Sequence, residues 1–267
     1  MNRIDKKFIE LNANGKKAFV AFITAGDPDL RVTEELVLSL TRCGVDIVEL
    51  GVPFSDPMAD GPTIQRASER ALKNKVSLEG ILRLVKRLRT NTQIPLALMS
   101  YYNPIFKYGI NRFVKDAVKD GVDGVIVPDL PPEEAKDLLN ISRKLDFATI
   151  FLLSPTSTEE RIKLIAKEST GFIYYVSLTG VTGAREELPE EELFFMIREI
   201  KKYTAKPICV GFGISRSGQA KRLCRISDGV IVGSAIVRMI EGNLGKGYLV
   251  GRVEKFVKGI AGAIHGG

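Results

Sequence analysis

Histidine and cysteine are scarce in this sequence of 267 residues. It contains one histidine, His265, and three cysteines, Cys43, Cys209 and Cys224. A single histidine argues against a histidine-centred catalytic triad and against a site with several histidine ligands. The cysteines lie far apart without Cys-x-x-Cys spacing, which indicates reduced thiols in a reducing compartment. We therefore predict no metal site in this chain.

Long apolar runs, linkers and low-complexity segments are also missing. No run of 18 apolar residues occurs, so the sequence predicts no transmembrane helix, and its polar N-terminus is unlike a signal peptide. No segment rich in proline and serine divides the chain. These absences predict a cytoplasmic protein with a single domain over residues 1–267.

The excess of positive charge is modest and spread along the chain. There are 39 basic and 32 acidic residues, a net charge of +7. The densest basic group, Arg83, Lys86, Arg87 and Arg89, alternates with apolar residues at helical spacing. This pattern indicates the solvated face of an amphipathic helix. Nucleic-acid binding is disfavoured because no aromatic residues are interleaved with the basic ones.

Short apolar runs alternate with amphipathic stretches along the whole chain. Nearly continuous apolar runs are typical of strands buried on both faces, as in a parallel sheet. Strands are predicted over 18–24, 46–51, 96–100, 124–127, 148–153, 172–176, 208–211 and 229–233. Helices are predicted over 32–43, 64–73, 78–90, 111–120, 133–145, 158–168, 189–203, 217–225 and 251–264.

Eight strands that alternate with helices predict an α/β fold, a single (β/α)₈ TIM barrel. The amphipathic segment 4–11 predicts an extra N-terminal helix, and extra helices are expected after the second and eighth strands. A doubly wound open sheet is the alternative. It is disfavoured because no Gly-x-Gly-x-x-Gly motif follows the first strand.

Acidic residues gather at the end of the second predicted strand, where a barrel carries its active site. Glu49 interrupts an apolar run, and burial there would raise its pKa toward neutrality, which suits a group that takes and gives a proton. A structural carboxylate that caps backbone N–H groups is an equal alternative. Asp56 and Asp60 follow in a loop with three prolines. Asp60 is the stronger functional candidate, since Asp56 suits a turn.

Glycine-rich loops follow the seventh and eighth predicted strands. They contain Gly211, Gly213, Gly233 and Ser234. In barrels these loops, with the N-terminus of a short extra helix, often bind phosphate through backbone N–H groups. Tight turns for packing are the alternative. A third loop, over 177–185, is rich in glycine and threonine and is a candidate lid, or else a plain mobile loop.

Several of these motifs together resemble the tryptophan synthase alpha subunit family, and the match covers nearly the whole chain. The most specific motif is the run Pro-Phe-Ser-Asp-Pro-Met-Ala-Asp-Gly-Pro-Thr-Ile-Gln at 53–65. Further matching stretches are 21–28, 49–65, 99–104, 127–131, 180–184, 210–214 and 232–235. Pro128 departs from the family pattern, in which a small residue often lines the pocket at this point.

The resemblance implies a lyase that cleaves indole-3-glycerol phosphate reversibly, by a retro-aldol reaction, into indole and glyceraldehyde 3-phosphate. Glu49 would shuttle protons between the glycerol hydroxyl and indole C3, and Asp60 would hold the indole N–H. The implied indole pocket consists of Phe22, Met99, Tyr101, Ile126, Leu153, Tyr174 and Phe212. The implied phosphate donors are Gly183, Gly211, Phe212, Gly213, Gly233 and Ser234, and Thr182 would connect the lid to Asp56 or Asp60.

Family members act with a beta subunit, which binds pyridoxal phosphate and receives the indole, in an alpha2beta2 heterotetramer. The resemblance implies no cofactor in this chain. It places four residues, which we expect to lie in loops, near the partner interface: Asp56, Asn103, Phe106 and Asp129. Three other functions remain open: a sugar-phosphate isomerase or epimerase, a barrel that only activates a partner, and a free-standing lyase that releases indole.

Overall fold

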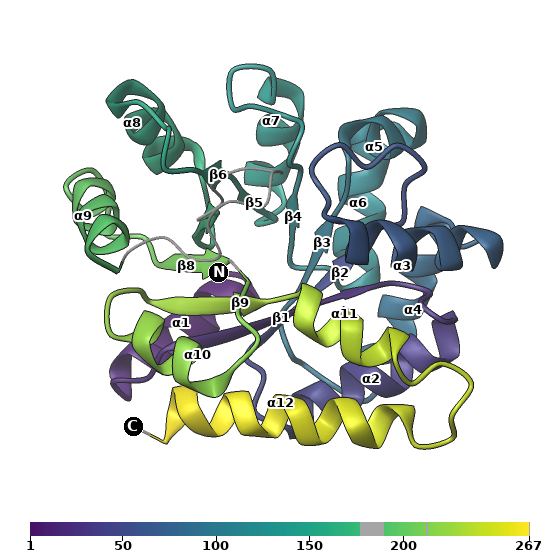
Figure 1. Cartoon of the computed structure of the whole chain (residues 1–267). Coiled ribbons are helices and arrows are strands. Elements are labelled where there is room, and N and C mark those ends of the chain that lie inside the picture. The colour runs from purple at the N-terminus through teal and green to yellow at the C-terminus, as the bar shows by residue number, and fades with distance from the viewer. Residues whose placement is uncertain (177–189, 212, 267) are drawn as a thin grey trace.

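The structure is a computed structural model that describes residues 1–176, 190–211 and 213–266. Its strands form one parallel sheet in the order β5-β4-β3-β2-β1-β9-β8-β7-β6 (Figure 1). The strands are β1 Ala18–Thr24, β2 Ile47–Gly51, β3 Leu96–Met99, β4 Gly124–Ile126, β5 Ala148–Ile150, β6 Leu152–Leu153, β7 Ile173–Val176, β8 Ile208–Gly211 and β9 Gly229–Val232.

The sheet closes into a barrel through one continuous segment. β5 pairs with β4, and β6 pairs with β7 on the other side. These two strands are separated only by Phe151, so together they are the single strand predicted over 148–153. The nine strands therefore correspond to the eight predicted ones, and the (β/α)₈ barrel is confirmed.

Helices surround the barrel and join its strands. They are α1 Arg3–Ala13, α2 Leu30–Arg42, α3 Pro62–Lys73, α4 Leu78–Leu88, α5 Tyr102–Tyr108, α6 Ile110–Asp120, α7 Lys136–Lys144, α8 Glu159–Glu168, α9 Glu190–Lys201, α10 Ser217–Cys224, α11 Ser234–Glu241 and α12 Leu249–His265. The predicted N-terminal helix is α1, and α3 with α4 and α11 with α12 confirm two helices after the second and eighth barrel strands.

Helix α5 was not predicted from the sequence, and it corrects two assignments. Asn103 and Phe106 were expected in a loop, but both lie on α5, between β3 and α6. The helix has only seven residues, and Pro104 stands in its first turn. Proline is tolerated there because the first N–H groups of a helix have no partner within it.

The strands are buried on both faces, which explains their continuous apolar sequences. Along β1, all seven residues are buried. Side chains alternate between two clusters. Those facing inward meet the apolar face of α1 and form what we call the inner cluster: Ile4, Phe8, Leu11, Ala18, Val20, Ile47, Ala97, Ile126, Ala148, Ile150, Phe172, Cys209 and Ile231. Those facing outward, such as Phe19, Val48 and Leu98, pack beneath the helices in the outer cluster.

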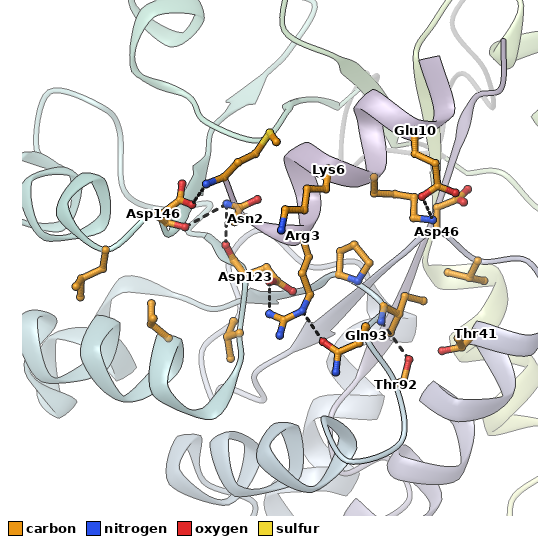
Figure 2. A pocket seen from close by; sticks show the side chains of 18 of the residues that line it. Asn2, Arg3, Lys6, Glu10, Thr41, Asp46, Thr92, Gln93, Asp123 and Asp146 are labelled. Atoms are coloured by element: carbon orange, nitrogen blue, oxygen red, sulfur yellow. Dashed lines mark hydrogen bonds and ion pairs between the residues drawn. The ribbon is translucent and has the colours of Figure 1, made fainter. Parts of the chain in front are cut away.

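An ion-pair network holds α1 across the end of the barrel where the strands begin. Arg3 Nη1 lies 2.9 Å from one oxygen of the buried Asp123, and Arg89 Nη2 lies 2.8 Å from the other. Leu96 donates its backbone N–H to the same carboxylate. Figure 2 shows Arg3 reaching Asp123 and Gln93 beside an open cavity of about 970 Å³. In TIM barrels the active site lies at the opposite end, where the strands finish, so this network serves stability.

The basic residues of segment 78–90 divide between two roles. Arg83, Lys86 and Arg87 are exposed on α4, as the amphipathic pattern predicted. Arg89, the C-cap residue, instead points inward to Asp123. Among the described residues, no helix is both long and apolar enough to cross a membrane.

Candidate active site

Glu49 lies on β2 and faces the inside of the barrel. Its Cα is in register with Phe22 on β1 and Ala97 on β3, and its side chain is fully buried. Neither of its carboxylate oxygens has a hydrogen-bond partner among the described residues. Burial raises the pKa of Glu49 to about 8, the direction that the sequence predicted. Glu49 is therefore a neutral acid near pH 7, ready to give up a proton.

Asp60 lies on the loop between β2 and α3, and Tyr101 fixes its position. The Tyr101 hydroxyl accepts the Ala59 N–H at 2.8 Å and is hydrogen-bonded to the Asp60 carboxylate. The Gln65 amide donates to the Asp60 carbonyl at 2.8 Å. Burial raises the pKa of Asp60, and the Tyr101 hydrogen bond partly opposes this. Tyr101, predicted at the edge of the indole pocket, thus supports the loop from below.

A cavity of about 720 Å³ opens at the ends of the strands, between the Asp60 loop and α11. Its walls are mostly apolar, with polar groups at two sides. The predicted site residues that line it are Phe22, Asp60, Met99, Leu153, Tyr174, Gly211, Gly213, Gly233 and Ser234. Lining residues that the sequence reading missed include Ile64, Leu152, Ile231 and Arg238, and Pro128 lines it as well.

Glu49 does not itself line this cavity, but two of its neighbours do. Phe22 is its register partner, and the Glu49 charge contributes to a raised pKa of the Tyr174 hydroxyl, after burial. Ile126 does not border the cavity either, since it belongs to the inner cluster beneath it. A substrate in the cavity would therefore meet the rings of Phe22 and Tyr174 next to the buried carboxyl group.

Leu152 and Leu153 both border the cavity, although only Leu153 was predicted to do so. Leu152 packs against the inner cluster, as do Met99 and Tyr174. Leu153, the predicted wall residue, borders the cavity but belongs to the outer cluster. Because side chains alternate along a strand, these two neighbours pack on opposite faces of the sheet.

Glycines and the start of α11 also border the cavity, next to Phe22 and Tyr174. Gly233 is the N-cap of this helix and makes no side-chain cap. Backbone N–H groups at the start of α11 are therefore available to an anion, which the helix dipole also favours. Gly213 adopts a φ of 43°, a left-handed conformation suited to glycine. Phe212, Thr182 and Gly183, and the rest of the candidate lid, lie outside the described residues.

Ion pairs connect α11 to α3. Arg66 binds the Glu241 carboxylate with two nitrogens, at 2.7 and 2.8 Å, and Arg70 Nη1 adds a contact at 2.9 Å. These hydrogen bonds lower the pKa of Glu241 to about 2. Arg70 also binds both oxygens of the buried Asp27, at 2.8 and 2.9 Å. The helix that follows Asp60 and the helix that begins at Ser234 are thus fixed to each other.

The residues predicted near a partner interface lie on this catalytic face of the barrel. Asp129 accepts the Tyr102 backbone N–H at 2.8 Å, and thus holds the start of α5. Phe106, on α5, is 62% exposed, which is unusual for a large apolar side chain. Asp56 accepts a hydrogen bond from Ser55 and lines a second cavity beside the loop. Its predicted contact with Thr182 involves a residue outside the described ones.

The side chains within the described ranges form no group of three or more His, Cys, Asp or Glu that could hold a metal ion. The three cysteines are free and buried.

Comparisons with known proteins agree over nearly the full length of the chain. A family model described as tryptophan synthase alpha chain matches residues 8–264. The tryptophan synthase alpha chain of Geotalea daltonii is 56% identical over 246 residues, which cover 92% of this chain and 93% of that protein. The corresponding protein of a Thermoanaerobacter species is 49% identical over 260 residues, 97% and 98% of the two chains.

Solved structures show the same similarity. The alpha subunit of tryptophan synthase from Legionella pneumophila superposes with a TM-score of 0.92 at 40% identity and covers 99% of this chain and 98% of that one. A chain of tryptophan synthase from Mycobacterium tuberculosis, in an aminoacrylate-bound form, gives a TM-score of 0.89 at 31% identity and covers 99% and 100% of the two chains.

Proposed function

The chain belongs to the tryptophan synthase alpha chain family, and we propose from this premise that it cleaves indole-3-glycerol phosphate reversibly into indole and glyceraldehyde 3-phosphate. The observation that carries the proposal is Glu49: a buried carboxyl group with no hydrogen-bond partner among the described residues, next to a mostly apolar cavity that the start of α11 also borders. As a carbon–carbon lyase, the chain would use this group to move a proton.

Glu49 acts first as an acid and then as a base. With a pKa of about 8, it holds its proton near neutrality and can donate it to C3 of the substrate's indole ring. The resulting carboxylate then takes the proton of the glycerol hydroxyl next to the scissile bond. As the C–C bond breaks, its electrons return to the ring, indole leaves, and the hydroxyl carbon becomes the aldehyde of glyceraldehyde 3-phosphate. Glu49 ends the cycle protonated, as it began.

Asp60 stabilises the charge that appears between these two proton transfers. Protonation at C3 turns the ring into a cation with its charge at the N–H. Asp60 lines the cavity and is held by Tyr101, so its carboxylate can accept this N–H. A preorganised opposite charge lowers the barrier most at the moment when the charge develops.

The shape of the cavity divides the substrate between two regions. The indole ring would lie among Phe22, Met99 and Tyr174, while the phosphate would meet the N–H groups at Gly213, Gly233 and Ser234. We propose that the chain needs no cofactor, because the protonated indole ring itself accepts the electrons of the breaking bond.

We further propose that the chain passes indole to a beta subunit carrying pyridoxal phosphate, in an alpha2beta2 assembly in the cytoplasm. Family membership supports the partner. On the catalytic face, Phe106 and Met58 are 62% and 92% exposed, so α5 and the Asp60 loop offer apolar surface to such a subunit.

Release of indole from indole-3-glycerol phosphate by the purified chain, with and without a beta subunit, tests the proposal. Slow release that rises with the partner supports the alpha-subunit function, and fast release without a partner favours the free-standing lyase. Competition by indolepropanol phosphate, an analogue without the reacting hydroxyl, separates the lyase from a sugar-phosphate epimerase, which would ignore it. No release under either condition contradicts the assignment.

A further inference from the structure

Arg238 lies on α11 one helical turn after Ser234, and both residues line the active-site cavity. Residues four apart lie one above the other on a helix, and Cα–Cβ bonds tilt toward the helix N-terminus. The Arg238 side chain is exposed and borders the same cavity as Gly233 and Ser234, which begin the helix without a side-chain cap.

Glu241, the acidic residue of α11, is already paired with residues of another helix. Glu241 is three residues further on and could pair with it across the helix surface. Its two oxygens are instead bound by Arg66 and Arg70 of α3. No hydrogen bond or ion pair connects the Arg238 side chain with any of the residues that the structure describes. The α3 arginines therefore leave one cation at the cavity without an anionic partner in the described part of the chain.

We propose that Arg238 recognises the phosphate group of the substrate. This rests on the proposed function, since it assigns a further residue to the same site. Backbone N–H groups and the helix dipole supply only partial charges at the start of α11. A guanidinium adds a full positive charge and a fork of donors that fits two phosphate oxygens. Arg238 is a binding residue that distinguishes phosphorylated from unphosphorylated substrates.

The test compares Arg238→Gln with Arg225→Gln. Arg225 is an exposed arginine at the C-cap of α10, does not line the cavity, and its loss changes the net charge by the same amount. Arg238→Gln should raise KM for indole-3-glycerol phosphate roughly tenfold, the scale of one lost hydrogen bond to a charged group, with most of the loss in KM and not in kcat. Arg238→Lys, which keeps the charge, should recover part of the affinity.

Phosphate-free indoleglycerol identifies the group that Arg238 contacts. Its kcat/KM should be the same, within twofold, in Arg238→Gln and in the Arg225→Gln control. An equal loss for both substrates, or an unchanged KM for the phosphorylated one, overturns the proposal.

Binding of inorganic phosphate, measured by calorimetry on the unmodified chain and both variants, separates this proposal from the proposed function. If the chain fails to cleave indole-3-glycerol phosphate, weaker phosphate binding in Arg238→Gln alone still supports the phosphate contact. Equal phosphate affinity in all three proteins, or none in the unmodified chain, overturns it.

Discussion

The ring of Tyr174 occupies the space that any side chain at position 211 would need. An alanine Cβ at Gly211 would lie 2.5 Å from the Tyr174 hydroxyl oxygen and 2.7 Å from the adjoining ring carbon, far inside van der Waals contact. Both residues line the active-site cavity. The glycine is therefore required by the position of the tyrosine, in addition to any use of its own N–H group.

We expect Gly211→Ala to displace Tyr174, to destabilise the fold by about 1–3 kcal/mol, and to weaken binding of indolepropanol phosphate. A second change, Tyr174→Leu, should restore much of the stability because it removes the ring. Denaturant unfolding and analogue titration measure both effects. Gly259→Ala, on α12 with open space around it, is the control and should not destabilise. A Gly211→Ala variant that matched this control would contradict the steric explanation.

Glu49→Gln should abolish turnover, because glutamine can neither donate nor accept the proton in this chemistry. The substitution nearly preserves the size of the side chain, so analogue binding should stay within about tenfold. Single-turnover indole release and analogue titration test this, and turnover like that of the unmodified chain would remove Glu49 from its proposed role.

The pH dependence follows from the raised pKa of Glu49. Its reactive form at the start of cleavage is protonated, so kcat/KM should fall above about pH 8, tenfold for each further pH unit. Initial rates measured between pH 6 and 10, over the range in which the protein stays folded, would show this fall in kcat/KM. A flat profile up to pH 10 would contradict the assignment of the acid.

The same shift predicts how stability changes with pH. Glu49 ionises near 4.5 in the unfolded chain and near 8 in the folded one. Between these values the unfolded state loses its proton first, so stability falls with rising pH by up to about 1.4 kcal/mol per pH unit from this group and then levels off. Glu49→Gln lacks this contribution and should gain stability relative to the unmodified chain from pH 5 to 8, as measured by denaturant unfolding.

Asp60→Asn should lower kcat by about 10²-fold or more, the scale of a lost electrostatic group at a developing charge. The hydrogen bond from Tyr101 can persist to the amide oxygen, so the loop should stay in place. Thermal unfolding and analogue binding serve as the controls for that. Activity within a few-fold of the unmodified enzyme would exclude Asp60 from the mechanism.

Removal of Arg70 and removal of Arg66 should reduce the stability of the fold by different amounts. Arg70→Gln strands the fully buried Asp27 carboxylate and should cost about 3–5 kcal/mol of stability. Arg66→Gln breaks a pair with the partly exposed Glu241 and should cost about 1 kcal/mol or less. Urea unfolding of both variants tests the comparison, and equal losses would contradict it.

The sequence was informative where burial forces a pattern. Strands buried on both faces must be continuous apolar runs, so the barrel and the exceptional Glu49 were visible without coordinates. The glycine loops and Ser234 were predicted as a phosphate site because they follow the seventh and eighth strands of the barrel. Helix α5 was missed because seven residues with a proline carry too little periodicity.

Other features depend on contacts that no local pattern records. Leu152 borders the cavity as Leu153 does, although only Leu153 was predicted there. Arg238 looks like any exposed helical arginine. We could propose a phosphate contact for it only from the structure, in which Arg66 and Arg70, more than 160 positions away in the chain, bind the Glu241 carboxylate.

The closure of the sheet through Phe151 also bears on how the chain behaves at high concentration. An open sheet ends in two strands whose free N–H and C=O groups can recruit strands from other molecules. Here β5 and β6, the two ends of the strand order, belong to one segment, so within the described residues the sheet has no separate edge strand of the kind that an open sheet exposes. Pairing with a strand of another molecule is thereby disfavoured, which leaves side-chain surfaces such as α5 for association with other chains.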